Sequence, residues 1–128
     1  MRKLIVAFLL TFVAFSATAQ VSNVETLQSA VTTAVTGSTF QVKGWPELRA
    51  VQVYGTTSAG SGAAEVAVQG SNDGTVWETL GTVTLTLGTA VTSGSFVSQA
   101  PWPYVRSKVN SISGTNAQVT VKVGVAQK

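Results

Sequence analysis

The chain has 128 residues, with eight Lys or Arg, five Asp or Glu, and neither His nor Cys. This length is enough for one domain. The missing residue types exclude a Cys nucleophile, a Ser–His or Cys–His pair, and a zinc site built from His or Cys. They also exclude disulfides, so a packed core has to hold the fold by itself.

The first residues have the pattern of a secretion signal. Arg2 and Lys3 precede an apolar run over residues 4–15, and residues 16–19 read Ser-Ala-Thr-Ala, which ends in small-x-small. The pattern predicts a signal peptide over residues 1–19 and a mature chain that starts at Gln20. The apolar run is shorter than the roughly 20 residues of a membrane span. The alternatives are a retained N-terminal anchor and an apolar arm buried in an assembly.

Removal of this segment changes the charge balance. The whole chain has a net charge of +3, but six basic and five acidic residues remain after Arg2 and Lys3 are lost, which leaves +1. So weak a positive charge neutralises few phosphates, so we expect no nucleic-acid partner. Uncharged strand edges tend to pair with other chains, which favours a homo-oligomer or a protein lattice over a free monomer.

Residues 20–38 fit two structures. Ser22 and Glu25 match a capping box, and apolar residues recur at helical spacing from Val24 to Val35. The many Thr and Val residues are poor helix formers. A short helix and an extended N-terminal arm along the sheet therefore remain equally open, and the predicted domain begins at residue 39.

Apolar and polar residues alternate through most of the remaining chain, which is typical of half-buried strands. Strands are expected at residues 39–43, 48–54, 64–69, 75–80, 82–87, 95–99, 104–111 and 117–125. Asp73-Gly74 lies between two of them and predicts a hairpin, with Trp77 in the core. Residues 55–63, all Gly, Thr, Ser and Ala, are expected to form a flexible loop, and residues 88–94 a second loop. Seven or eight short strands over residues 39–128 predict one all-β, antiparallel, jelly-roll-like sandwich.

The five acidic side chains give no catalytic pattern. Hydrolysis of a glycoside needs two carboxylates across one cleft, and Asp73 at a turn and Glu78 on the next strand are not expected to share one. Asn72 and Asp73 are too few for calcium, which takes six or more oxygen ligands. We therefore predict no enzyme activity, no metal and no cofactor.

Aromatic and basic residues are the candidate ligand-binding groups. Trp45, Trp102 and Tyr104 lie beside prolines, and Pro101 and Pro103 cannot lie in the middle of a sheet. Their rings either stack on sugar rings or cover the open ends of the core. Arg106 could bind an anion, although it and Lys108 could equally pair with Glu65 or Glu78 across neighbouring strands.

Two motifs resemble known β-sandwiches. Ser71-Asn72-Asp73-Gly74-Thr75-Val76-Trp77 fits a Ser-x-Asp-Gly-x-x-Trp turn, and Tyr104-Val105-Arg106 and Ile112-Ser113-Gly114 follow it. The combination resembles discoidin-like (galactose-binding-like) domains and short β-sandwich proteins of tailed-phage structural modules. The resemblance implies a hairpin and a core Trp, and it carries over neither ligand residues nor an assembly role.

These observations together predict a non-catalytic extracellular structural or interaction module. The protein is expected to be secreted, periplasmic or on the cell surface, or in a virion if a phage encodes it, where it would be a surface or decoration protein. The alternative is a secreted carbohydrate-binding module that uses the three aromatic rings. We expect no membrane span once the signal is removed.

Overall fold

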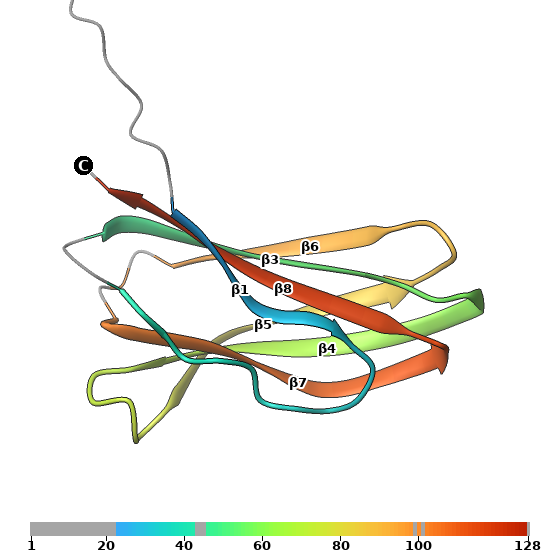
Figure 1. Cartoon of the computed structure of the whole chain (residues 1–128), viewed down its shortest axis with the longest axis horizontal. Coiled ribbons are helices and arrows are strands. Elements are labelled where there is room, and N and C mark those ends of the chain that lie inside the picture. The colour runs from blue at the N-terminus through green and yellow to red at the C-terminus, as the bar shows by residue number, and fades with distance from the viewer. Residues whose placement is uncertain (1–22, 43–45, 99, 101, 128) are drawn as a thin grey trace, which may run out of the picture.

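The structure is a computed structural model that describes residues 23–42, 46–98, 100 and 102–127. The described residues form two four-stranded antiparallel sheets, in the orders β1-β8-β3-β6 and β2-β7-β4-β5 (Figure 1). The strands are β1 Asn23–Val31, β2 Phe40–Gln41, β3 Pro46–Thr56, β4 Ala59–Ser71, β5 Glu78–Leu87, β6 Thr92–Ser98, β7 Tyr104–Thr115 and β8 Gln118–Gln127. This strand order is that of a jelly roll. The predicted all-β sandwich is confirmed.

The core consists mainly of valines that alternate along the strands. Val119, Val121 and Val123 of β8 have no exposed surface, and their side chains lie between the sheets. The predicted inward face of β5 and the inward pair Val51 and Val53 of β3 are also buried. Each such side chain contributes about 1.5 kcal/mol or more through burial, so this alternation stabilises the sandwich without disulfides.

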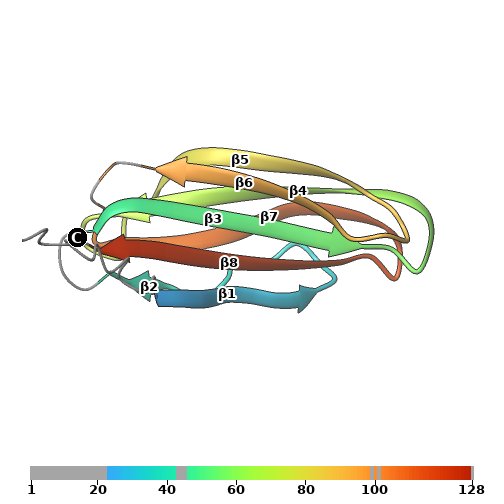
Figure 2. The same cartoon turned by 90° about the horizontal axis from the view of Figure 1, so that it is seen from above.

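The connections divide the molecule into two ends (Figures 1 and 2). The turns β3–β4, β5–β6 and β7–β8 cross between the sheets at one end, which we call the turn end. The β4–β5 loop and the β6–β7 connection lie at the other end, which we call the loop end. The predicted signal segment, residues 1–19, lies outside the described residues.

The expected flexible loop at residues 55–63 is wrong. β3 continues to Thr56 and β4 begins at Ala59, so only Thr57 and Ser58 separate them. The small residues serve close packing instead. A side chain at Gly55 would overlap the carbonyl oxygen of Gln118, and one at Gly62 would overlap that of Ser113.

β5 is one strand where two were expected. It begins at Glu78, not at Thr75, and a register shift opposite Val68 and Gln69 leaves Leu80 as the extra residue of a bulge. Gly81, expected to separate two strands, pairs with Val68 inside β5. Similarly, the loop expected to extend to Gly94 ends earlier, because β6 begins at Thr92.

The segment after β1 forms a strap, residues 32–39, along the edge of β7. β1 itself is extended and pairs with β8, so the helical alternative for this region is wrong over Asn23–Val31. The buried amide of Gln28 donates from Nε2 to the Val35 carbonyl (2.9 Å) and accepts at Oε1 from Ser107 Oγ (2.9 Å). Val35 also exchanges two backbone hydrogen bonds with Val109, at 3.2 and 2.9 Å. The strap therefore extends the pairing of β2 along β7.

Candidate functional site

A closed set of hydrogen bonds fixes the β4–β5 loop. The buried hydroxyl of Ser71 donates to Asp73 Oδ1 (2.9 Å) and accepts from the Gly74 amide (2.9 Å). Asp73 Oδ1 also accepts from the amides of Thr75 (2.8 Å) and Val76 (2.9 Å). Gly74 has φ of 75°, which favours glycine at this position. The turn expected from the sequence is confirmed, and it determines where the next residue, Trp77, lies.

The Asp73 carboxylate has a fixed role in this turn. Hydrogen bonds from the Val76 and Thr75 amides, followed by those from the Thr75 and Ser71 side chains, hold its pKa well below the usual range. The group is therefore ionised at all physiological pH values, and one of its oxygens is already occupied by donors of the loop.

The loop forms one wall of a cleft of about 280 Å³ at the loop end, which we call the aromatic cleft. Two half-buried indole rings contribute to it, Trp77 from the β4–β5 loop and Trp102 from the β6–β7 connection. Its remaining lining residues are Gly70, Asn72, Asp73, Val76 and Glu78. The cleft therefore combines aromatic surface with an amide and two carboxylates.

Trp102 forms the inner wall of the cleft. Its ring packs against the hydrophobic core, and it lies so close to Gly70 that a Cβ there would be 2.7 Å from the indole Cγ and Cδ2. Of the two roles considered for this ring, closing the core end is what the structure shows, and the ring still lines the cleft. Tyr104 is half-buried beside Gly74, and its hydroxyl accepts a bond from Gln41 Nε2 (3.4 Å).

Trp77 forms the outer wall, which corrects its assignment to the core. It is half-buried, and it does not belong to the buried cluster. The guanidinium carbon of Arg106 lies 4.0 Å from the centroid of the Trp77 ring, a cation–π arrangement. Arg106 Nε also donates to Gln69 Oε1 (2.8 Å). Arg106 therefore stacks on the Trp77 ring and supports its position.

The ion pairs considered for Arg106 and Lys108 are not formed within the described residues. Glu65 instead accepts a hydrogen bond from Asn110 Nδ2 (2.8 Å), and the partners of Arg106 are Trp77 and Gln69. The expectation that Asp73 and Glu78 do not share a cleft is also wrong, because both line the aromatic cleft.

Another basic residue, Arg49 of β3, is buried at the loop end. Only 3% of its surface is exposed, and its Nη1 donates to the Ala100 carbonyl (3.2 Å). Burial lowers the pKa of this guanidinium. Within the described part of the chain, its Nε finds no acceptor.

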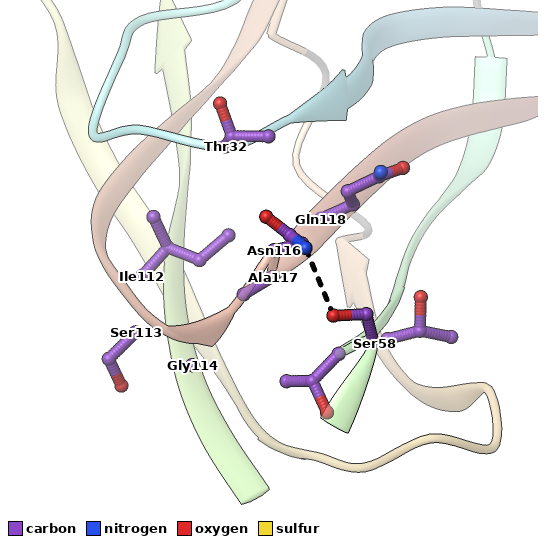
Figure 3. A pocket seen from close by; sticks show the side chains of 10 residues that line it. Thr32, Ser58, Ile112, Ser113, Gly114, Asn116, Ala117 and Gln118 are labelled. Atoms are coloured by element: carbon purple, nitrogen blue, oxygen red, sulfur yellow. Dashed lines mark hydrogen bonds between the residues drawn. The ribbon is translucent and has the colours of Figure 1, made fainter. Parts of the chain in front are cut away.

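A second pocket, of about 640 Å³, lies at the turn end (Figure 3). Its lining is uncharged and mostly polar, with Thr, Ser, Asn and Gln side chains around Ile112 and Ala117. Asn116 Nδ2 donates to Ser58 Oγ across it (3.1 Å), as the dashed line in Figure 3 shows. It lacks aromatic surface and charge, so the aromatic cleft is the stronger candidate site.

The described residues contain no group of three or more His, Cys, Asp or Glu placed to hold a metal ion. The same part of the chain has no helix long and apolar enough to cross a membrane.

The structure brings together some of the predicted site residues. Trp102 lines the aromatic cleft, Arg106 supports its outer wall, and Tyr104 packs beside the turn that shapes it. Trp45 lies outside the described residues. Sequence reasoning missed Trp77 and Glu78 as site residues. The available signal was the position of Trp77 immediately after a Ser-x-Asp-Gly turn, before the alternation of β5 resumes.

Comparison with known proteins gives similarity of fold. No protein-family model matches the chain, and no curated protein matches it. PBSX exported protein XepA aligns with a TM-score of 0.56 at 17% identity, over 83% of this chain and 38% of XepA. The chain thus spans well under half the length of XepA. SPBc2 prophage-derived protein YomS aligns with a TM-score of 0.54 at 18% identity, over 83% of this chain and 93% of YomS.

A third solved structure, described as "CBM4 structure and function", aligns with a TM-score of 0.45 at 10% identity, over 85% of this chain and 81% of that one. This likeness is too remote to carry an argument. The expected likeness to phage-encoded β-sandwiches is confirmed for the fold, through XepA and YomS, but not for the specific motifs that suggested it.

Proposed function

We propose that the chain is a non-catalytic binding module of an exported or virion-surface assembly, and that the aromatic cleft binds a saccharide unit of an extracellular polymer. The observation that carries this proposal is the meeting of Trp77 and Trp102, from two separate connections, in one cleft with polar side chains. Two indoles that leave surface exposed at one site favour a flat ligand with apolar faces.

The chemistry of the cleft fits a sugar ring. A pyranose presents C–H groups on its faces and hydroxyls at its rim, so it needs aromatic surface and a few hydrogen-bonding groups. Trp77 and Trp102 supply the former, and Asn72 and Glu78 supply the latter. The cleft volume of about 280 Å³ is close to the lower end of ligand pockets, about 300 Å³, which suits a short saccharide segment.

The charge of the cleft supports a neutral ligand, and the low pKa of Asp73 argues against this carboxyl group as a catalytic acid. Asp73 and Glu78 place negative charge in the cleft, which disfavours phosphate or carboxylate polymers. A glycoside hydrolase needs one carboxylic acid with a raised pKa as proton donor. The pKa of Asp73 is lowered, because loop amides stabilise its ionised form.

The sequence and the fold both support the proposed extracellular or virion-surface setting. The predicted signal segment and the small net charge of the mature chain agree with export or with exposure on a particle. The similarity in fold to an exported PBSX protein and a prophage-derived protein supports the same setting. A virion-surface or decoration role is the form of this proposal that applies if a phage encodes the chain.

A glycan array followed by calorimetry on the best ligand tests the proposal. Trp77→Ala removes one wall without touching the buried core, so we expect binding to weaken about tenfold or more. Val91→Ala, at an exposed valine of the β5–β6 turn, is the matched control and should bind as the wild type does. The proposal is refuted if no polysaccharide binds, if Trp77→Ala binds normally, or if the bound glycan is cleaved.

A further inference from the structure

The two long sides of the sandwich are built differently. Figure 2 shows β1 and β2 along one side and β5 and β6 along the other. On the first side, β2 has only two residues, β1 has two register shifts and carries Glu25, and the strap covers β7. Short strands, irregular pairing and charge are the devices that keep a sheet edge from pairing with another chain.

The other side lacks these devices at β6. This strand pairs with β3 over seven consecutive residues, from Arg49 opposite Ser98 to Gly55 opposite Thr92, with no register shift. It contains neither a charged residue nor a proline. β6 is the last strand of its sheet, so among the described residues no strand pairs with the backbone groups on its outer edge. Val97 on its outer face is 53% exposed.

We propose that β6 pairs antiparallel with β6 of a second copy of this chain, about a two-fold axis through Ser95. The two β1-β8-β3-β6 sheets would then join into one continuous eight-stranded sheet. A two-fold interface of this kind closes on itself, so it predicts a dimer and not a filament. It uses no residue of the aromatic cleft, and it stands independently of the saccharide proposal.

The sequence of β6 is self-complementary in this register, which is why a second copy is the occupant. Ser95 lies opposite Ser95 of the second copy, and Ser93 lies opposite its Val97 on the same outer face. On the inner face, Gly94 lies opposite Phe96, whose ring packs over Gly81 of β5 in its own copy. No like charges meet anywhere along the pair.

The outer face of the sheet gives a second argument. A row of uncharged residues crosses all four strands of this sheet. Val24 of β1 pairs with Gly124 of β8, which pairs with Ala50 of β3, which in turn pairs with Val97 of β6. Val24 and Val97, at the two ends of this row, are both more than half exposed. Pairing at β6 continues this row into the second copy and covers Val97 from its open side.

Charge-swap variants test the proposal by analytical ultracentrifugation of the protein as isolated from its producing cells. Ser95→Lys and Ser95→Glu each place like charges opposite one another, so each should raise the dimer dissociation constant roughly fivefold or more at low salt. An equimolar mixture of the two should restore the dimer. Ser29→Lys makes the same change at an exposed position of β1, the opposite edge strand of the same sheet, and should leave the dimer unchanged.

Several outcomes would overturn the proposal. A wild-type protein that stays monomeric at high micromolar concentration contradicts it directly. Failure of the mixture to reassociate, or equal disruption by Ser29→Lys, would show that another surface forms the contact. Circular dichroism confirms that each variant is folded. Glycan binding by the Ser95→Lys monomer separates a failure of this proposal from a failure of the saccharide site.

Discussion

Replacement of Gly70 by alanine is the sharpest test of how the fold shapes the aromatic cleft. Gly70 is buried in β4, directly beneath the ring of Trp102. An alanine Cβ would lie 2.7 Å from the indole Cγ and Cδ2, and 3.0 Å from Leu80 Cδ1. Carbon atoms pack at about 3.5–4.0 Å, so the indole has to move by the better part of an ångström.

The expected cost follows from two opposing terms. Overpacking of a filled site costs about 1–3 kcal/mol. Replacement of glycine by alanine recovers about 0.4–1 kcal/mol, because the unfolded chain loses conformational freedom. The net destabilisation of Gly70→Ala is therefore about 1–2 kcal/mol, which lowers the Tm of a domain near 100 residues by about 4–16 °C, at about 4–8 °C per kcal/mol.

Thermal unfolding followed by circular dichroism measures this change, and tryptophan fluorescence reports the displacement of Trp102. Gly88→Ala is the matched control, because a Cβ at Gly88 meets no atom within 4 Å and its φ is not in the left-handed region. It should be neutral or slightly stabilising. A wild-type Tm and emission spectrum for Gly70→Ala would show that Trp102 does not pack on Gly70 and does not form the inner wall of the cleft.

Two further predictions concern the loop and the strap. The pKa of Asp73 is lower in the folded state than in the unfolded chain, so the unfolded chain binds a proton at higher pH than the folded protein does. The contribution of ionised Asp73 to the free energy of unfolding is therefore present above about pH 4 and decreases as the pH falls further. Acid titration of tryptophan fluorescence should show this decrease, and the acid sensitivity of Asp73→Ala should be smaller; equal sensitivity of the two proteins would contradict the role of Asp73. Gln28→Ala leaves the buried Ser107 hydroxyl without its acceptor and removes one of the two hydrogen bonds to the Val35 carbonyl, which keeps the one from the Val109 amide, at a cost of about 1–3 kcal/mol. Hydrogen exchange at the Val35 and Gly37 amides should accelerate in that variant and remain unchanged in Gln52→Ala, at an exposed position of β3.

The sequence allowed the core to be predicted where a strand has one buried and one exposed face. Val119, Val121 and Val123 alternate with polar residues, and only one register buries all three. The same reasoning correctly placed Val83, Leu85 and Leu87 on the inner face of β5. Alternation is a local signal, so it predicts the buried face of a strand correctly even where the ends of that strand are predicted incorrectly.

The predictions of strands and loops were wrong where small residues can serve two structural roles. Gly55 and Gly62 were expected in a flexible loop, because glycine and serine are common in turns. In the structure these glycines allow backbones of neighbouring strands to approach closely, at Gln118 and Ser113. Composition alone cannot distinguish the two uses, because the close approach depends on strands more than 50 residues further along the chain.

The site was less predictable than the fold for a related reason. Trp77 lies next to Arg106 and in one cleft with Trp102, and neither relation is visible in the spacing of these residues along the chain. They meet because β4 pairs with both β5 and β7, which brings the β4–β5 loop beside the start of β7. The position of Trp77 in the cleft, and not in the core, is a consequence of this strand pairing, which the sequence alone does not reveal.

The Ser-x-Asp-Gly-x-x-Trp motif explains why a resemblance in sequence predicted the fold more firmly than the ligand. Ser71, Asp73 and Gly74 are occupied in hydrogen bonds and backbone geometry of the turn, so their pattern specifies a loop conformation. Any ligand of the cleft would also depend on groups that the motif does not contain, such as Trp102 and Glu78. A second sandwich with the same motif would therefore present its tryptophan in the same way, and it would bind the same ligand only if its β6–β7 connection also supplied an aromatic wall.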